Sequence, residues 1–211
     1  MAVIRSDNVG LVEAVTDIDK RALVTALDEA IATSGMTQAA YAAALGTSGP
    51  RLSSYRTGKV TPSATFLLRA VRVARSLRDA HQKGWMTAGS VARAISDALV
   101  SEDEMWAYKM ALQGRDHLHE LLRESPELSG AWETVPASTG SPAWDAFVAA
   151  LTAHEFSLAE RAAPAWTAQP PLADPWVLDS PRLTYEQVRA RTPRWLAERG
   201  IFVTERDLST L

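Results

Sequence analysis

The sequence predicts a mainly α-helical protein, and three observations support this class. Apolar residues recur at three- and four-residue spacing over much of the chain, whereas the sustained apolar–polar alternation of half-buried strands is absent. Helix-start and helix-stop residues punctuate the chain. Hydrophobic residues make up 46% and charged residues 22% of the 211 residues, a globular balance that excludes wholesale disorder. The length suits one large domain or two small ones.

Four helices are expected in the first 80 residues, and each has a recognisable start or end. The first ends at Gly35 and the second at Gly46, because glycine favours the left-handed backbone that follows a helix. Ser48 caps the third, with Pro50 in its first turn, where a missing N–H costs little. Ser63, after a proline, opens the fourth. The expected helices cover residues 20–34, a short alanine-rich run between Thr37 and Gly46, 48–57 and 63–77.

Three more helices and one strand are expected in the rest of the chain. Ser90 precedes a helix whose apolar residues recur every fourth position. The run Ser101–Glu104 matches a capping box and starts a long helix toward residue 125. Ser141 starts another helix, which stops before Pro164. Residues 201–203 are the only credible strand, and a short one.

The net charge of −3 hides a basic block in an otherwise acidic chain. Residues 36–80 carry seven arginine or lysine side chains and the single acid Asp79, whereas the segments on both sides are acidic. Such a block indicates a local site for a polyanion, since the chain as a whole would repel one. The alternative is that these arginines are simply solvated on the surface of a helix. The four arginines between residues 69 and 78 are three apart, so they spiral around their helix and cannot all face one line of phosphates.

Residues 37–63 carry the pattern that points to a function. A short helix, a tight turn at Gly46 and a second short helix, each with one apolar face, form a helix-turn-helix. Leu52 and Tyr55 are spaced to pack inward, which turns the opposite side of the 48–57 helix toward solvent. A helix of this kind fits the major groove of DNA, where base edges are read from its N-terminal half.

The same residues resemble the Cro/repressor (Xre-type) helix-turn-helix family. The match runs without a gap from Thr37 to Ser63, and the flanking helices extend it to about residues 19–78, nearly a third of the chain. The resemblance implies a helical DNA-binding fold and a transcription regulator. The residues that carry it are Thr37-Gln38-Ala39-Ala40-Tyr41-Ala42, Leu45-Gly46-Thr47-Ser48, Leu52-Ser53, Tyr55, Gly58-Lys59 and Pro62-Ser63.

The resemblance also implies which residues meet DNA. Gln38, which opens the second helix, matches a position that clamps the DNA backbone, and Thr57 and Lys59 match positions that meet phosphates. Arg51 lies among the positions that face bases. The expected DNA-binding residues are Gln38, Thr47, Ser48, Gly49, Pro50, Arg51, Ser54, Arg56, Thr57 and Lys59.

Two features depart from the family pattern. Gly49, Pro50 and Ser54 offer almost no side-chain donors, so the usual reading of bases by glutamine or asparagine is missing. Specificity is therefore expected from Arg51, from methyl contacts of Pro50 and from DNA shape. Arg56 stands where an acidic residue often follows the aromatic, which adds charge but removes a helix-stabilising partner.

The composition changes near residue 126. Nine of the 11 prolines lie from that residue on, and the stretch 126–142, rich in Pro, Ser and Gly, looks like a connection. The segments 163–166, 172–176, 192–196 and 200–203 resemble the C-terminal region of actinobacterial regulators encoded beside toxin-like partners. Their tryptophans are expected to fill a core, or in one or two cases to anchor a dimer or heterologous interface. Five of the seven tryptophans lie here: Trp132, Trp144, Trp166, Trp176 and Trp195.

Signals for catalysis or metal binding fail on inspection. Without cysteine the chain has no thiolate nucleophile, disulfide or cysteine zinc ligand. His117 and His119 point about 200° apart on a regular helix and cannot share one ion. His154-Glu155 begins like a metalloprotease signature, but no histidine follows at the required spacing. A glycine-rich phosphate loop and a Gly-x-Ser-x-Gly elbow are also missing, so we expect no enzyme, metal or cofactor.

No segment predicts export or membrane insertion. Charges interrupt the first twenty residues, so no signal-peptide run fits there, and no stretch of about 18 apolar residues follows. A cytoplasmic protein without a membrane partner is expected. The interrupting charges are Arg5, Asp7, Glu13, Asp17, Asp19 and Lys20.

These features predict three parts: a helix-turn-helix DNA-binding domain over residues 1–80, linking helices over 81–125, and a helical, Trp- and Pro-rich domain for dimerisation or partner binding over 126–211. The expected function is a sequence-specific double-stranded DNA-binding regulator, a repressor that binds an inverted-repeat operator as a homodimer. The last part is favoured as the dimer seam over the long helix with Trp106 and Met110. The alternatives are an antitoxin, which neutralises a cognate toxin through its C-terminal region and autoregulates through the helix-turn-helix, and a small-molecule sensor with a tryptophan-lined pocket.

Overall fold

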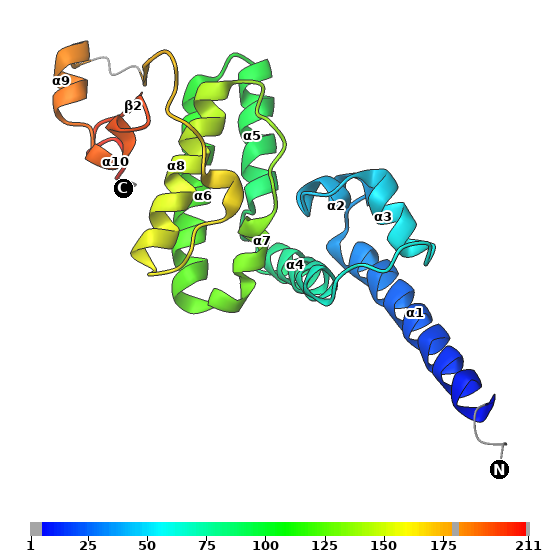
Figure 1. Ribbon diagram of the computed structural model, residues 1–211. Coiled ribbons are helices and arrows are strands. Elements are labelled where there is room, and N and C mark those ends of the chain that lie inside the picture. The colour runs from blue at the N-terminus through cyan, green and yellow to red at the C-terminus, as the bar shows by residue number, and fades with distance from the viewer. Residues whose placement is uncertain (1–5, 179–181, 210–211) are drawn as a thin grey trace. The chain divides into compact units, whose positions relative to one another are not determined.

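The chain is mainly α-helical, as the sequence predicts (Figure 1). The structure, a computed structural model, describes the backbone of residues 6–178 and 182–209 and, within these ranges, the side chains from residue 17 on. The charged side chains of Arg5, Asp7 and Glu13 therefore lie outside the described residues. The chain divides into two compact units, Met1–Arg78 and Asp79–Leu211.

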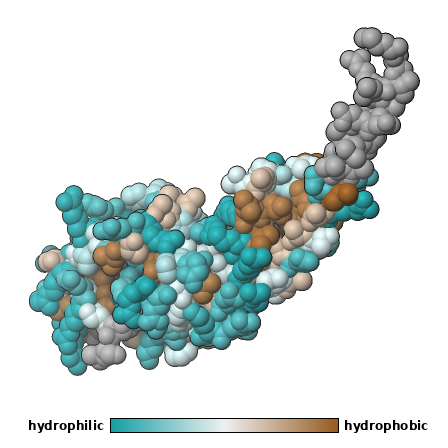
Figure 2. Space-filling view, turned by 90° about the horizontal axis from the view of Figure 1, so that it is seen from below, coloured by the Kyte–Doolittle hydropathy of each residue, from teal (hydrophilic) through white to brown (hydrophobic). Residues whose placement is uncertain are grey.

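The smaller unit is a set of helices around one apolar core. Its elements are α1 (Ser6–Ser34), α2 (Gln38–Ala44), α3 (Gly49–Arg56) and the larger part of α4 (Ala64–Gln82). Each helix contributes at least one side chain with no exposed surface, namely Leu27, Tyr41, Leu52 and Val73. Hydrophobic residues also gather on the face of this unit that Figure 2 shows.

Helix α1 begins at Ser6, well before the predicted start near residue 20. The apolar spacing that marks the core begins only at Leu23, because the preceding side chains from Asp17 to Ala22 are all exposed. The helix thus extends beyond the core that it helps to build, and a pattern of buried positions cannot reveal such an extension.

The larger unit contains the remaining elements, and hydrophilic residues cover most of its face in Figure 2. Residues 81–125 belong to this unit together with residues 126–211 and do not form a separate linking segment. The reason is packing, since Tyr108 of α6 stacks on Phe147 of α8 with 6.2 Å between the ring centroids. The elements are α5 (Ala88–Val100), α6 (Glu104–Glu124), η1 (Pro126–Ser129), α7 (Gly130–Glu133), α8 (Pro142–Leu158), η2 (Ala165–Thr167), β1 (Trp176–Val177), α9 (Tyr185–Ala190), α10 (Arg194–Ala197) and β2 (Ile201–Phe202).

Two helices of the larger unit start differently from the prediction. Helix α5 is capped by Thr87, whose hydroxyl accepts from the Ser90 amide while the Ser90 hydroxyl accepts from the Thr87 amide, so Ser90 lies inside the helix. Helix α6 is capped by Asp103, whose carboxylate accepts from the Trp106 amide at 2.8 Å. Ser101, the predicted cap, instead ends α5. Several capping residues follow one another here, and the sequence pattern alone does not rank them.

Helices α5 and α6 approach closely at Gly114. A Cβ atom built on Gly114 would lie 2.3 Å from Cγ2 of Val91, far inside van der Waals contact. Val91 is itself buried, with 1% of its surface exposed. Glycine is therefore required at this position by the packing of the two helices, not by its backbone conformation.

Replacing Gly114 by alanine is expected to destabilise the larger unit by about 1–3 kcal/mol, because the added methyl group overpacks a filled core. Gly89→Ala is the matched control: Gly89 is also helical, and a Cβ there meets nothing within 4 Å. That change should be neutral or stabilising, since alanine is the better helix former. Thermal unfolding of both variants checks the prediction, and equal melting temperatures would contradict it.

Two of the five tryptophans after residue 126 lie in the core of the larger unit, and the other three are partly exposed. Trp132 and Trp144 are fully buried, and Trp166, Trp176 and Trp195 are half-buried. The indole nitrogens are also used internally, since Trp132 donates to the Met86 carbonyl at 3.1 Å and Trp166 to the Trp132 carbonyl at 2.9 Å.

A short parallel pairing brings distant parts of this unit together. The predicted strand forms as β2, and Trp176 of β1 lies opposite Ile201. The Trp176 ring also contacts the Trp144 ring at 5.0 Å, so the strand pair is anchored on α8.

Candidate nucleic-acid interface

Helices α2 and α3 are joined by a turn of fixed geometry. The amide of Thr47 donates to the Ala42 carbonyl and the amide of Gly46 to the Ala43 carbonyl, both at 2.9 Å, which is the hydrogen-bond pattern of a Schellman motif. Gly46 has φ +69°, a conformation in which a residue with a Cβ is strained. Thr37 caps α2 through the Ala40 amide. The two short helices therefore form the predicted helix-turn-helix unit.

Helix α3 is held against the core along one side. Leu52 and Tyr55 are buried, and the Tyr55 ring packs on the Phe66 ring of α4 with 5.2 Å between the centroids. The side chain of Ser48 caps the helix by accepting from the Arg51 amide. The opposite side of α3 faces solvent, as its apolar spacing predicts.

Helix α2 is fixed by a buried tyrosine. The Tyr41 hydroxyl donates to the Ala70 carbonyl of α4, and Tyr41 has no exposed surface. Burial raises the pKa of Tyr41, so the hydroxyl stays protonated and the hydrogen bond persists over the physiological pH range.

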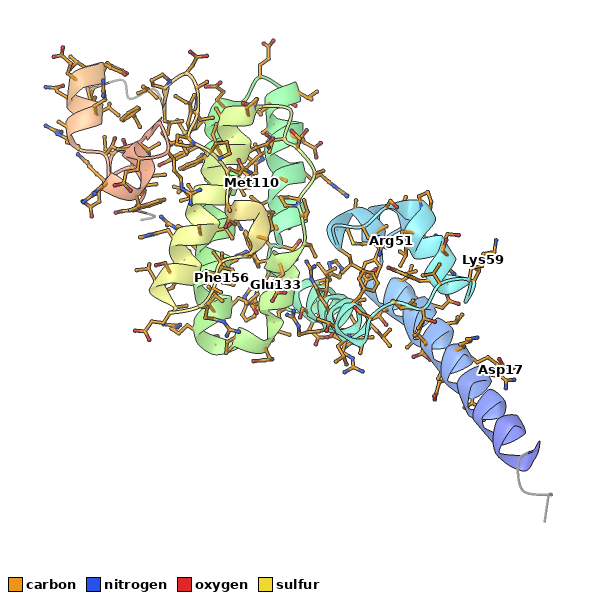
Figure 3. All side chains as sticks on the ribbon, viewed as in Figure 1. Asp17, Arg51, Lys59, Met110, Glu133 and Phe156 are labelled. Carbon is orange, nitrogen blue, oxygen red and sulfur yellow. The ribbon has the colours of Figure 1, made fainter. Side chains whose placement is uncertain are left out.

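All ten predicted DNA-binding residues belong to α2, α3 and the turns beside them. Their positions in the chain place them along one helix-turn-helix unit, and Figure 3 labels Arg51 on α3 and Lys59 in the turn that follows. The exposed residues are Ser48, Pro50, Arg51, Thr57 and Lys59, and the half-buried ones are Gln38, Thr47, Gly49, Ser54 and Arg56.

Two hydroxyl groups, that of Ser54 in α3 and that of Thr57 at its C-terminal cap, already donate to backbone carbonyls. Ser54 donates to the Pro50 carbonyl and Thr57 to the Ser53 carbonyl, both at 3.0 Å. Because the other side chains on this face are small, a binding partner can approach the backbone of α3 closely. Arg51 is the one charged donor on the outward N-terminal half of the helix.

The Arg51 side chain is oriented by Tyr55. Its Nε donates to the Tyr55 hydroxyl at 2.7 Å, and its guanidinium lies 5.8 Å from the ring centroid. This hydrogen bond raises the pKa of Arg51, a side chain that is charged throughout the physiological pH range. Within the described part of the chain the two terminal nitrogens of Arg51 have no partner, and they remain able to donate as a pair to a ligand. Sequence reasoning placed Tyr55 in the core and missed this orienting contact.

Arg56 is tied to two other helices. Its Nε lies 2.5 Å from Oδ1 of Asp28 on α1, and a terminal nitrogen donates to Oε1 of Gln38 on α2. Asp28 thus gives Arg56 a carboxylate partner from another helix, a contact that the sequence pattern does not reveal. The same contact occupies the oxygen of the Gln38 amide and leaves its NH2 group as the side that is able to meet a phosphate.

The arginines of α4 do not act as one group. Arg69 is half-buried, and Arg72, Arg75 and Arg78 are exposed. Arg72 and Arg78 interact with other residues of the chain. Their three-residue spacing turns successive side chains around the helix, as predicted, so one phosphate track cannot meet all four.

The two histidines of α6 contact different partners. His117 Nδ1 accepts from the Met86 amide at 3.0 Å, whereas His119 Nδ1 lies 2.9 Å from the buried Glu155 carboxylate. Among the described residues no group of three His, Cys, Asp or Glu side chains is arranged to hold a metal ion.

The search for a membrane span and the comparisons with known proteins give negative results. No helix in the described ranges is both long and apolar enough to cross a membrane. Comparison with protein-family models, curated proteins and solved structures finds no significant match to this chain. The resemblance to the Cro/repressor family rests on the helix-turn-helix residues themselves.

Proposed function

We propose that the chain is a sequence-specific double-stranded DNA-binding transcription regulator, a repressor whose α3 enters the major groove. The observation that carries the proposal is the α2–α3 unit: both helices are capped and joined by a fixed turn, and α3 presents an outward face with an oriented arginine. The basic block around this unit supplies charge for phosphates. The proposal includes a cytoplasmic location, where such a regulator meets DNA.

In this proposal, some residues of the unit contact bases and others contact phosphates. Arg51, held by Tyr55, is suited to donate from its two terminal nitrogens to O6 and N7 of a guanine. Lys59 and the Gln38 amide are suited to phosphates on either side of the groove. Pro50 offers only apolar contact, which fits the methyl group of thymine. Occupancy of the operator then excludes polymerase, and no further chemistry is required.

Dimerisation is part of the proposal for an energetic reason. One recognition helix with a single charged donor reads only a few base pairs and competes poorly with non-specific sites. Two copies on a two-fold axis add their binding energies and read an inverted repeat with half-sites about 10 base pairs apart, or a multiple of that. The fully buried Trp132 and Trp144 cannot contact a second copy, and the seam is proposed to use other residues of the part 126–211.

Selection from a random duplex library with the full-length protein tests the function. The expected result is enrichment of an inverted repeat, together with a dimer in sedimentation at micromolar concentration. Failure to enrich any duplex would overturn the proposal of DNA binding. A monomer that enriches a single half-site would overturn only the dimer.

Arg51→Ala is expected to weaken binding to the preferred site by roughly 5- to 150-fold and to relax the preference at one base pair. Lys59→Ala should weaken binding to all sequences alike and lower the slope of log affinity against log salt by roughly one. A mismatch series measured by fluorescence anisotropy separates the two roles. If both variants lose affinity evenly across the series, Arg51 is a backbone contact.

Arg56→Ala is expected to behave differently from Lys59→Ala, because Arg56 is engaged by Asp28 and Gln38. The change should lower the free energy of unfolding of the smaller unit by about 1 kcal/mol or less, the usual range for an exposed ion pair. The salt slope of DNA binding should fall by well under one. Thermal unfolding and a salt titration check this, and a slope reduced as much as by Lys59→Ala would show that Arg56 meets a phosphate.

An antitoxin that also autoregulates through the same helix-turn-helix is the second candidate. One observation favours it, an exposed apolar cluster with acidic surroundings on the larger unit, described below. This cluster lies at residues 97–106, before the C-terminal region through which the sequence predicts toxin binding. The sensor gains less support. A cavity of about 180 Å³ has one tryptophan, Trp166, in its lining, and a second of about 570 Å³ has none.

A further inference from the structure

Three large apolar side chains of the larger unit are exposed within seven consecutive residues. Val100, which ends α5, is 84% exposed, and Met105 and Trp106, which begin α6, are 62% and 48% exposed. We call residues 97–106 the α5–α6 corner. Single exposed apolar residues are ordinary, whereas a group of them marks an interaction surface. The other exposed large apolar residues described in this unit are far apart in the chain: Val135, Leu158 and Tyr185.

The α5–α6 corner has a fixed backbone. Glu102 lies in the left-handed region with φ +55°, and its amide donates to the Leu99 carbonyl at 3.1 Å. The Asp103 amide donates to the Ala98 carbonyl at 2.9 Å, and the Asp103 carboxylate caps α6 through the Trp106 amide. The apolar side chains are therefore presented from helix ends that a hydrogen-bonded turn holds in place, so little backbone conformational entropy would be lost on binding.

The same corner is strongly acidic. Between residues 97 and 106 the chain carries four carboxylates and no basic side chain, and all four acidic residues are exposed. They are Asp97, Glu102, Asp103 and Glu104. Apolar side chains with charges at their border have the composition of a protein interface, in which aromatic residues and Met form the centre and charges the rim.

The negative charge of the α5–α6 corner indicates which kind of molecule could bind there. In a two-fold dimer the same patch faces itself, so a second copy would bring four carboxylates against four. Nucleic acid and anionic lipid surfaces would be repelled for the same reason. A protein surface that combines an apolar pocket with lysine or arginine at its edge would meet both features of the corner.

We propose that the α5–α6 corner binds a basic protein partner, with Trp106 and Met105 inserted into an apolar pocket and the four carboxylates facing lysine or arginine side chains at its rim. Trp106 supplies the central contact, since tryptophan dominates the binding energy of such interfaces. The carboxylates raise the rate of association and make it sensitive to salt. This proposal does not depend on DNA binding.

The proposal is tested on the full-length protein labelled with 5-fluorotryptophan, using two designed 14-residue amphipathic helical peptides as probes. One peptide carries leucine and lysine, and the other carries leucine and glutamate at the same positions. The Trp106 fluorine resonance, one of seven, is assigned by its loss in Trp106→Phe. We expect the leucine–lysine peptide to shift this resonance and the leucine–glutamate peptide to leave it unchanged. Equal effects of both peptides, or shifts confined to other tryptophans, would overturn the proposal.

Variants measured by anisotropy of the labelled leucine–lysine peptide make the test quantitative. Trp106→Ala and the neutral set Glu102→Gln, Asp103→Asn and Glu104→Gln should each weaken binding at least tenfold, and Asn at position 103 retains the helix cap. Leu158→Ala, which removes another exposed apolar side chain of the same unit, is the matched control and should leave affinity unchanged. Binding that survives both corner changes, or a Trp106→Ala change that dissociates a homodimer, would overturn the proposal.

Discussion

Raising the salt concentration from about 50 to 200 mM is expected to weaken the binding of one protomer to a duplex with a single half-site by roughly 250- to 1,000-fold. The basic block of the smaller unit suits about 4–6 phosphate contacts per monomer, and each neutralised phosphate releases condensed counterions. Log affinity should then fall against log salt with a slope near −4 to −5. Fluorescence anisotropy of a labelled duplex at four or five salt concentrations measures this slope directly.

The control for the salt titration is a lysine outside the basic block. Lys109 is exposed on α6 in the larger unit, within an acidic stretch of the chain. Lys109→Ala should leave the slope unchanged, whereas Lys59→Ala should reduce it by roughly one. An affinity that does not respond to salt would remove the electrostatic basis of the proposed function, whatever the sequence preference of the protein.

The smaller unit could be predicted from the sequence in most of its parts, because its signals are local. The cap at Thr37, the turn at Gly46 and the cap at Ser48 each act within a few residues, and the structure shows all three. The buried positions Leu52 and Tyr55 follow from helical spacing within one short helix. Local rules suffice where the fold is built from short, capped helices with short connections.

The contacts that orient the candidate site could not be predicted in this way. Arg56 contacts Asp28, which is 28 positions away in the sequence, and the pattern around neither residue predicts this ion pair. Arg51 and Tyr55 are only four residues apart. Helical spacing predicts that Tyr55 is buried in the core, but it does not predict that the Tyr55 hydroxyl also orients Arg51. Such pairs depend on how helices pack, which a helix pattern does not specify.

The organisation of the larger unit was also beyond local rules. Pro- and Trp-rich composition suggested a boundary near residue 126, but α5 and α6 before it pack on α8 after it. A fragment ending at Ser125 would therefore expose the core faces of α5 and α6, and a cut between the two compact units, near residue 78, is the better choice for isolating the helix-turn-helix. The tryptophan that the structure shows as exposed is Trp106 of α6, which lies before the Trp-rich part of the chain.

Replacing Leu52 by alanine is expected to lower the free energy of unfolding of the smaller unit by about 2–5 kcal/mol, because the change leaves a cavity in a packed core. Leu52 has no exposed surface and shares this core with Leu27, Tyr41 and Val73. A unit of this size is expected to have only about 4–10 kcal/mol of stability, so a large part of it is removed.

The expected result for Leu52→Ala is a separate early unfolding transition together with loss of DNA binding, while the larger unit, which has its own core, melts as before. Ser53→Ala is the matched control, since Ser53 is exposed on the same helix and its removal should change the melting temperature little. Calorimetry and DNA anisotropy of both variants decide the matter. A Leu52→Ala protein that melts and binds like the original would mean that α3 is not held by this core, and a single shifted transition would mean that the two units unfold together.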